Sequence, residues 1–189
     1  MSDEIHNVSN EIPGFSGIVR LLESKDLVDL KPVLEEWIKD RDTGNPLPTE
    51  VEKNLQVMSA SIGGGTDYTY FVATQVDGKA IGVIGMRPPE EKMMALDFLK
   101  TDKPVELINA YVSSFHRAGK GVGSSLVRKL EGEAIQRGFT EVVLNSGPRY
   151  KATGWGFYDK QPGYNRVGVA ISYYGPGGDA PVWKKSLVD

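Results

Sequence analysis

The stretch Val112-Ser-Ser-Phe-His-Arg-Ala-Gly-Lys-Gly-Val-Gly-Ser-Ser-Leu126 places three glycines between an apolar segment and a helical pattern. The segment that leads into it, Val105 to Val112, is typical of a buried strand. Glycines let the backbone adopt conformations that other residues avoid and approach a ligand closely. The first turn of the following helix adds unpaired N–H donors and a partial positive charge. The sequence therefore predicts an anion-binding loop, suited to a phosphate or pyrophosphate.

Two common phosphate-binding motifs do not fit this loop. A P-loop requires Gly-Lys-Ser/Thr, whereas Lys120 is followed by Gly121 and by no hydroxyl for magnesium. The dinucleotide motif G-x-G-x-x-G requires a third glycine where Ser124 or Leu126 stands. It also requires an acidic residue that ends a second strand, whereas Glu141 opens its strand. A tight turn that only joins the strand to the helix stays open as an alternative.

The residues after the loop predict a helix and a second buried strand. Apolar residues recur at helical spacing, namely Val122, Leu126, Leu130 and Ala134. Arg137-Gly138 is typical of the last turn and end of a helix, and Val142-Val143-Leu144 is typical of a buried strand. The aromatic segment Gly154-Trp-Gly-Phe-Tyr-Asp-Lys-Gln-Pro-Gly-Tyr164 follows. The predicted order is strand, loop, helix, strand and aromatic segment.

Together, the residues from Val105 to Tyr164 resemble the GNAT (GCN5-related) N-acetyltransferase superfamily. Its members place a Q/R-x-x-G-x-G/A loop over the pyrophosphate of acetyl-CoA and an F/L-Y-x-x-x-G-F/Y segment beside the thioester sulfur. This chain has Ala118 where glutamine or arginine is usual, with Arg117 one place earlier. The resemblance implies acetyl-CoA as the co-substrate.

The resemblance also implies which residues bind the coenzyme. In the family, the pantetheine arm lies between the central strand and the strand after the loop helix, and it pairs with the central backbone. The implied coenzyme-binding residues are Tyr111, Val112, Ser113, Arg117, Ala118, Gly119, Lys120, Gly121, Val122, Gly123, Ser124 and Asn145. The two cations of this set, Arg117 and Lys120, are equally typical of a solvated surface beside a loop.

Glu106 and Tyr158 are the candidate catalytic residues. Acetyl transfer to an amine requires a base for the amine, a donor for the oxyanion and an acid for the departing thiolate. Glu106 matches the catalytic glutamate of histone-type family members, and residues 106, 108, 110 and 112 share one face of a regular strand. The phenol of Tyr158 suits the acid, and the resemblance implies the Val112 N–H as the oxyanion donor. The alternatives are an exposed charge for Glu106 and a core aromatic for Tyr158.

The rest of the chain adds five strands and three helices to this unit. We expect strands at 18–22, 68–76, 79–86, 167–173 and 182–187, helices at 27–37 and 49–62, and an irregular segment at 87–103 that contains a short helix at 91–98. The short helix is left out of the element order given below. Thr49-Glu-Val-Glu52 predicts a capping box, and Asp77-Gly78 predicts a type I′ hairpin turn. The order β-α-α-β-β-β-α-β-α-β-β predicts an α/β (α+β) GNAT fold. Its sheet is mixed, mostly antiparallel and six- to seven-stranded, with helices on both faces.

Composition supports one domain and excludes several classes of protein. A chain of 189 residues with 40% hydrophobic residues is long enough for one sizeable core, here residues 16–189 after a loose leader at 1–15. With no cysteine and two histidines, a metal site is not expected. The net charge of −3 provides no basic field for nucleic acid. No membrane segment or signal peptide is expected, which favours a cytoplasmic protein.

The predicted function is the direct transfer of an acetyl group from acetyl-CoA to a primary amine. A small molecule is favoured as the carrier of this amine. Segments 39–48 and 173–181 correspond to the acceptor region of the family and carry Asp40, Asp42 and Asp179, which suit a cationic amine. A protein or peptide amine and a non-catalytic acyl-CoA-sensing module stay open as alternatives. A homodimer also stays open.

Overall fold

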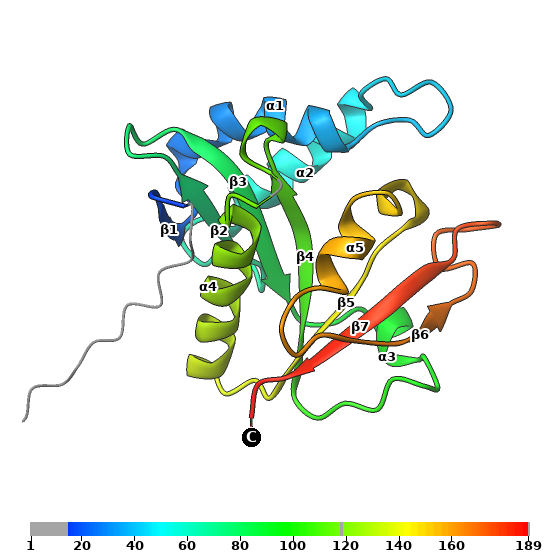
Figure 1. Cartoon of the computed structure of the whole chain (residues 1–189). Helices are drawn as coiled ribbons and strands as arrows, with labels where there is room; N and C mark the ends of the chain where they lie inside the picture. Colours follow the sequence, from blue (N-terminus) through cyan, green and yellow to red (C-terminus); the bar gives the residue numbers. More distant parts are fainter. Residues whose placement is uncertain (1–14, 118, 189) are drawn as a thin grey trace, which may run out of the picture.

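The computed structural model describes residues 15–117 and 119–188 of the chain (Figure 1). Most of the predicted leader, and Ala118 of the glycine loop, lie outside the described residues. The one described residue of the predicted leader, Phe15, is partly buried and packs against the core.

The described residues form a seven-stranded sheet in the order β1-β2-β3-β4-β5-β7-β6. The strands are β1 (Ile18–Leu21), β2 (Thr69–Thr74), β3 (Ala80–Arg87), β4 (Pro104–Val112), β5 (Glu141–Asn145), β6 (Asn165–Ala170) and β7 (Ala180–Ser186). Neighbouring strands are antiparallel except for β4 and β5, which are parallel. The prediction of a mixed, mostly antiparallel sheet is confirmed.

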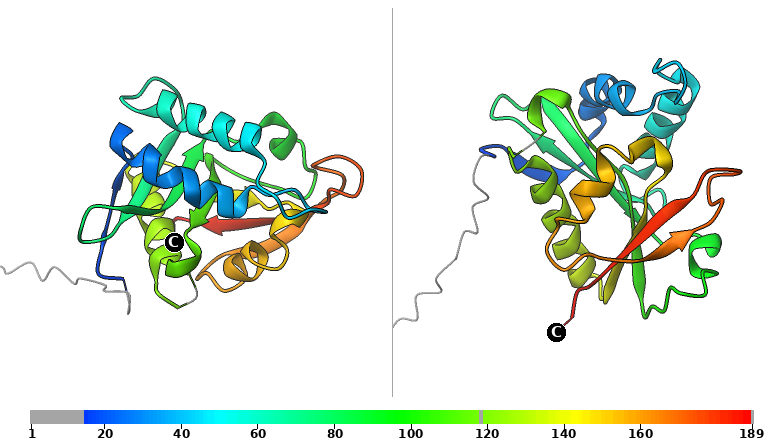
Figure 2. Two further views of the ribbon diagram at one scale, coloured as in Figure 1. Left: turned by 90° about the horizontal axis from the view of Figure 1, so that it is seen from above. Right: turned by 45° about the vertical axis from the view of Figure 1, so that its right-hand side comes forward.

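Helices cover both faces of this sheet (Figures 1 and 2). The helices are α1 (Leu27–Trp37), α2 (Pro48–Ser61), α3 (Glu91–Met94), α4 (Val122–Gln136) and α5 (Gly154–Tyr158). Phe71 of β2 packs in the core cluster that contains Leu126 of α4, whereas Val72 packs in the cluster that contains Leu30 of α1. Because side chains alternate along a strand, α4 and α1 lie on opposite faces.

A β-bulge interrupts the central strand β4 at Asn109. The φ angle of Asn109 is 50°, which is uncommon for a residue other than glycine. The register places Tyr111 opposite Val83 but Ile108 opposite Gly85, so β4 contains one extra residue here. Such a bulge bends and twists the strand that contains it.

The bulge changes which side chains of β4 share a face. Before the bulge, Ile108 packs with the α1 and α2 cluster, as expected for the face of Glu106. After it, Tyr111 faces this cluster, whereas Ala110 and Val112 pack against the α4 cluster. The expectation that residues 106, 108, 110 and 112 share one face is therefore wrong beyond 108, because an inserted residue reverses the alternation.

The two parallel strands separate at the centre of the sheet. The register of β4 and β5 runs from Pro104 opposite Glu141 to Glu106 opposite Val143 and stops there. The bulge of β4 begins three residues further on. Figure 1 shows α5 beside the region where the two strands have parted. The gap that the GNAT resemblance implies is thus present, and Glu106 is the last residue of β4 before it.

The β2–β3 hairpin does not use the predicted type I′ turn. Gly78 has a φ of 88°, but Asp77 does not have the positive φ that this turn requires. The N–H of Gly78 donates to the carbonyl of Gln75 at 2.9 Å, and the N–H of Gln75 donates to the carbonyl of Lys79 at 2.9 Å. The turn is therefore a three-residue loop in which Gly78 occupies the left-handed position.

The ends of several other elements differ from the prediction, and those of α2, β6 and α3 have the clearest consequences. Helix α2 begins at Pro48, and no side-chain cap forms there, so the predicted capping box is wrong. Proline fits a first helical position because its missing N–H would be unpaired there anyway. Strand β6 ends at Ala170 because Ser172 has a φ of 52° and donates its N–H to Asp179 at 2.7 Å. Helix α3 ends at Met94, four residues earlier than expected.

Candidate active site

A cavity of about 890 Å³ lies at the gap between β4 and β5. Its walls come from α1, α2, β3, β4, the segment between β5 and α5, and the loop between β6 and β7. Four of the predicted site residues line it, namely Glu106, Tyr111, Asn145 and Tyr158. The structure therefore gathers, around one space, side chains that lie up to 52 residues apart in the sequence.

Glu106 is buried, so its interpretation as an exposed surface charge is wrong. Only 2% of the residue is exposed. Its Oε2 accepts a hydrogen bond from Arg87 Nε at 3.1 Å and one from the N–H of Glu90 at 3.2 Å. Burial raises the pKa of Glu106, and the positive charge of Arg87 opposes this rise. The carboxyl group therefore has a higher proton affinity than an exposed glutamate.

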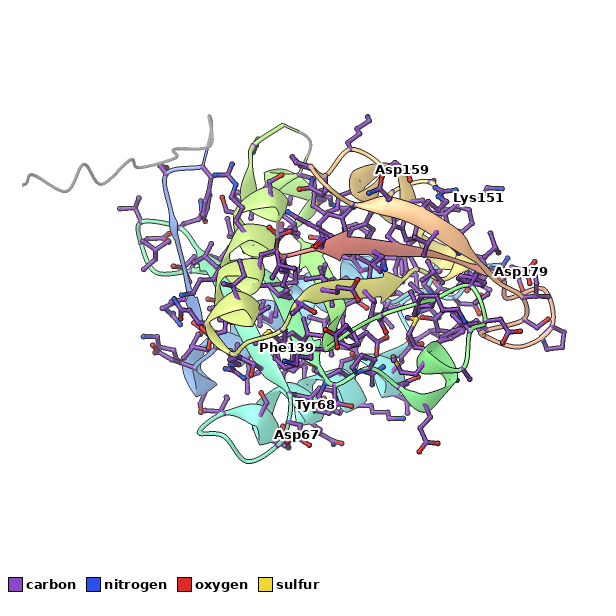
Figure 3. All side chains as sticks on the ribbon, turned by 90° about the horizontal axis from the view of Figure 1, so that it is seen from below. Asp67, Tyr68, Phe139, Lys151, Asp159 and Asp179 are labelled. Atoms are coloured by element: carbon purple, nitrogen blue, oxygen red, sulfur yellow. The ribbon has the colours of Figure 1, made fainter. Side chains whose placement is uncertain are left out.

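Arg87 links Glu106 to a wider polar network. Its guanidinium forms an ion pair with Glu90 at 2.6 Å and donates a hydrogen bond to the Tyr68 hydroxyl at 3.1 Å. Tyr68 directly precedes β2 and is labelled in Figure 3. Because Arg87 pairs with Glu106 across β3 and β4, the sheet itself holds the cation against the carboxylate.

Tyr158 reaches the cavity from the opposite face of the sheet. It ends α5 and is only 7% exposed. Its ring packs in the α4 cluster, with centroid distances of 5.5 Å to Trp183 and 6.4 Å to Tyr164. Burial raises the pKa of Tyr158, so its hydroxyl keeps its proton at neutral pH. Tyr158 is therefore a core aromatic whose side chain also lines the cavity.

Aromatic residues outside the predicted site also line this cavity, among them Trp37 and Tyr150. The hydroxyls of Tyr111 and Tyr150 lie 3.2 Å apart. Trp37 packs beside both, with ring centroids at 5.9 Å from Tyr111 and 6.0 Å from Tyr150. Trp37 appeared in the sequence only as the last apolar position of a helix, and nothing local in the sequence shows that α1 ends beside β4.

The N–H group of Val112 in β4 points away from β3, toward the side of the gap. Ser113 donates its N–H to Ile81 of β3 at 2.9 Å. Because backbone groups alternate between the two sides of a strand, the N–H and C=O of Val112 point away from β3. The Val112 carbonyl accepts a hydrogen bond from Trp37 Nε1 at 2.8 Å. Because the Val112 carbonyl is already hydrogen-bonded to Trp37, the Val112 N–H is the backbone group of this residue that a ligand in the gap could use.

The glycine loop has the backbone geometry of an anion site. Gly119 and Gly121 have φ angles of 85° and 73°, and Gly121 is the N-cap residue of α4. No side chain caps α4 among the residues that the structure describes. The N–H groups of Val122, Gly123 and Ser124, in the first turn, thus have no partner within the helix.

Gly123 also serves to pack α4 against α5. A Cβ atom at this position would lie 2.9 Å from Cε2 and 3.0 Å from Cζ of Phe157. The ring of Phe157 in turn contacts Tyr158, with centroids 5.2 Å apart. Ser124 Oγ accepts a hydrogen bond from Gln161 at 3.3 Å, just beyond α5. The loop and the helix that carries Tyr158 are thus in direct contact.

The two cations of the loop already have partners. The Arg117 guanidinium lies 3.1 Å from a Glu36 carboxylate oxygen and 4.3 Å from the centroid of the Trp37 ring. Lys120 Nζ donates to the carbonyl of Phe115 at 2.5 Å. Arg117 is therefore held against the end of α1, and Lys120 against the segment before α4. Ala118 lies between them, outside the described residues.

The acids expected to recognise a cationic acceptor do not line the cavity. Asp40 accepts hydrogen bonds from the N–H groups of Asp42 and Thr43 at 3.1 and 2.8 Å. Asp179 stabilises the β6–β7 loop, and Figure 3 shows it at the edge of the molecule. Both segments nevertheless contribute other residues to the wall, including Arg41 and Tyr174. The hydroxyl of Tyr174 donates to Asn145 at 2.5 Å.

Known structures share this architecture. A GNAT-family protein from Desulfovibrio desulfuricans superposes with a TM-score of 0.72 at 17% identity, over 92% of this chain and 100% of that chain. An aminoglycoside 6′-N-acetyltransferase complexed with coenzyme A gives a TM-score of 0.62 at 20% identity, over 91% and 98%. The ribosomal-protein-S18-alanine N-acetyltransferase of Escherichia coli gives 0.61 at 18%, over 92% and 95%. The sheet, its gap and its helices thus define a GNAT acyl-CoA N-acyltransferase fold.

A protein-family model also matches the sequence and assigns the chain to one family within this fold. The model of the acetyltransferase (GNAT) family matches residues 33–164, which contain β4, the glycine loop and α5. The chain belongs to this family of acetyltransferases. No curated protein matches the sequence. Within the described residues, no helix is long and apolar enough to span a membrane, and no group of three or more potential metal ligands occurs.

Proposed function

We propose that this protein transfers the acetyl group of acetyl-CoA directly to the primary amine of a small molecule. The observation that carries the proposal is the meeting of Glu106 and Tyr158, from opposite faces of the sheet, at one cavity beside the β4–β5 gap. A non-catalytic acyl-CoA sensor would need the loop but neither of these two side chains.

The glycine loop would bind the pyrophosphate of the coenzyme. The free N–H groups of the first turn of α4, together with the helix dipole, favour an anion at this position. The pantetheine arm would then lie in the gap and bring the thioester to the Val112 N–H, which donates a hydrogen bond to the developing oxyanion. Arg117 and Lys120 would have to leave their present partners to reach the phosphates.

The reaction then requires three proton transfers: one from the ammonium group, one from the nitrogen after its attack, and one to the sulfur. Glu106, directly or through a water molecule, takes a proton from the ammonium group, which frees the nitrogen lone pair. The nitrogen attacks the carbonyl carbon and forms the C–N bond. The second N–H proton then passes through water to the Tyr158 oxygen as this hydroxyl gives up its own proton, and the C–S bond breaks. Tyr158 donates its proton to the sulfur, and the products are an amide and the free thiol of CoA. The raised pKa of Glu106 brings its basicity closer to that of the amine.

Two measurements test the proposal. Thermal shift with acetyl-CoA, CoA, ATP and NAD should show stabilisation by the two coenzyme A compounds only. Release of free thiol is then followed with benzylamine, an aminoglycoside and a peptide with an N-terminal alanine. Since the chain contains no cysteine, the protein contributes no thiol to this assay. Stabilisation by CoA without thiol release would favour the sensor, and release with the peptide alone would favour a protein acceptor.

Replacing Tyr158 with phenylalanine should lower kcat by about 10-fold or more, because the thiolate loses its proton donor. The dissociation constant of acetyl-CoA should stay nearly unchanged, since the ring and its packing against Trp183 remain. Stopped-flow thiol release and calorimetry measure the two quantities. Unchanged turnover would remove Tyr158 from the mechanism.

Replacing Arg87 with glutamine should move the acidic limb of the kcat/KM profile to higher pH. Arg87, at 3.1 Å, opposes the rise in the pKa of Glu106, so loss of this cation should raise the pKa of the carboxyl group further. The profile is measured with one amine between pH 5 and pH 9. A limb that stays in place, with wild-type thermal stability, would show that Glu106 does not control this limb.

A further inference from the structure

The carboxylates of the cavity wall are already neutralised by cations. Glu50 forms an ion pair with Arg149 at 2.8 Å, with a second hydrogen bond at 3.2 Å. Glu90 and Glu106 share Arg87, at 2.6 and 3.1 Å. Glu90 forms a second ion pair, with 3.2 Å between its Oε2 and Lys92 Nζ. The acids of the wall therefore leave little negative charge for a cationic substrate.

The cavity wall contains more cations than acids. Five cationic side chains line it, namely Arg41, Lys53, Arg87, Lys92 and Arg149, against the three glutamates. Arg41 and Lys53 differ from the others because neither has a carboxylate within 4.0 Å in the described part of the chain. Their acidic neighbours in sequence, Asp40, Asp42 and Glu52, do not line the cavity.

These two exposed cations line the cavity at α2 and at the segment that precedes it. Arg41 lies in the segment between α1 and α2, and Lys53 lies on α2. Asn54, next to Lys53, accepts a hydrogen bond from Asn109 of the β4 bulge at 2.5 Å, which fixes this part of α2 against the central strand. None of the loop residues 117–123 that the structure describes lines the cavity. Arg41 and Lys53 are therefore separate from the proposed phosphate site of the coenzyme.

We propose that Arg41 and Lys53 bind an anionic group, a carboxylate or a phosphate, carried by the acceptor amine. This inference rests on the proposed function and specifies its substrate class. The amine would lie toward Glu106 and Tyr158, and the anionic group would lie toward α2. The aromatic wall formed by Trp37, Tyr111 and Tyr150 lies in the same cavity and suits an apolar or aromatic body between the two ends.

Matched amines test the anion preference. The probes are 4-(aminomethyl)benzoate, its neutral amide 4-(aminomethyl)benzamide, and 4-(aminomethyl)phenylphosphonate. They share one ring and one aminomethyl group, so that the anionic group is the main difference. We expect kcat/KM for the benzoate or the phosphonate to exceed that for the amide by about 10-fold or more, which corresponds to about 1.4 kcal/mol. The larger of the two ratios identifies the anion as a carboxylate or a phosphate type.

Two variants test whether Arg41 and Lys53 cause the preference for anionic amines. In Arg41→Gln/Lys53→Gln, the ratio of kcat/KM between the anionic and neutral amines should fall toward one. In Lys31→Gln, which removes an exposed cation of α1 that does not line the cavity, the ratio should stay at its wild-type value. A ratio near one in the wild-type protein, or a ratio that survives the double substitution, would overturn the proposal.

Different results would contradict the proposed acetyl transfer and the proposed anion site at Arg41 and Lys53. Absence of thiol release with every amine would contradict the proposed function. The anion preference is then measured by calorimetric binding of the three probes to the CoA-bound protein, where the benzoate or the phosphonate should bind about 10-fold more tightly than the amide. Equal binding of all three probes would overturn the anion site, whatever the outcome of the thiol assay.

Discussion

Replacing Gly121 with aspartate is expected to abolish acetyl-CoA binding, with a rise in the dissociation constant of about 100-fold or more. Gly121 has a φ of 73° at the N-cap of α4, a conformation that costs other residues roughly 1–2 kcal/mol. The new carboxylate would also lie where the pyrophosphate is expected and would repel it by several kcal/mol. A 100-fold change in affinity corresponds to about 2.7 kcal/mol, so the two effects together suffice.

Two control variants separate charge from backbone strain and from general effects on the helix. Gly121→Ala introduces the strain without the charge and should weaken binding less than the aspartate does. Gly132→Asp places the same charge further along α4, at an exposed position where a new Cβ meets no atom within 4 Å. Calorimetry with acetyl-CoA and thermal unfolding are measured for all three. Wild-type affinity in Gly121→Asp would show that the coenzyme phosphates bind elsewhere.

Replacing Glu106 with glutamine is expected to lower kcat/KM at pH 7 by about 100-fold, because a positioned general base contributes roughly 10²- to 10⁴-fold. Glutamine has nearly the same shape and can still accept a hydrogen bond from Arg87, so the site should keep its geometry. Acetyl-CoA affinity should change little, since Glu106 lies away from the glycine loop. Thiol release over a series of amine concentrations measures the effect.

The prediction also fixes the direction in which kcat/KM should change with pH. Glu106 acts as a base only when ionised, so activity should rise with pH through its pKa, which burial places above the ordinary value of 4.5. This acidic limb should be absent from Glu106→Gln. Asp26→Asn is the matched control, because Asp26 is 1% exposed and pairs with Arg20 at 2.7 Å outside the cavity. It should lower the melting temperature and leave the profile in place. A limb that persists in Glu106→Gln would assign the base to another group.

The order of elements could be predicted because it depends on local patterns. Apolar residues at helical spacing in α4 and alternating or continuous apolar runs in the strands mark each element without reference to the others. The left-handed conformations of Gly119 and Gly121 agree with the role that the sequence predicted for them. Element ends were less accurate, as at α2 and β6, because a single proline or one side chain of the following loop decides them.

The bulge of β4 could not be predicted in the same way. Asn109 has no sequence feature that requires a φ of 50°, and its conformation accompanies contacts with Asn54 of α2 and the hydroxyl of Tyr70. The alternation beyond it was therefore predicted wrongly. The consequence for the site is large, because the bulge turns Tyr111 toward the cavity and lies beside the gap between β4 and β5.

The sequence by itself predicted the family, a candidate anion-binding loop and the candidate pair Glu106 and Tyr158, because short motifs and spacings carry this information. Only the tertiary structure decided the state of each charge. It buried Glu106 beside Arg87, paired Arg117 with Glu36 and directed Asp40 to N–H groups of its own loop. Within the described residues, it left Arg41 and Lys53 without a carboxylate partner. The physical reason is that a charged side chain acts through its nearest partners, and folding brings those partners from distant parts of the chain.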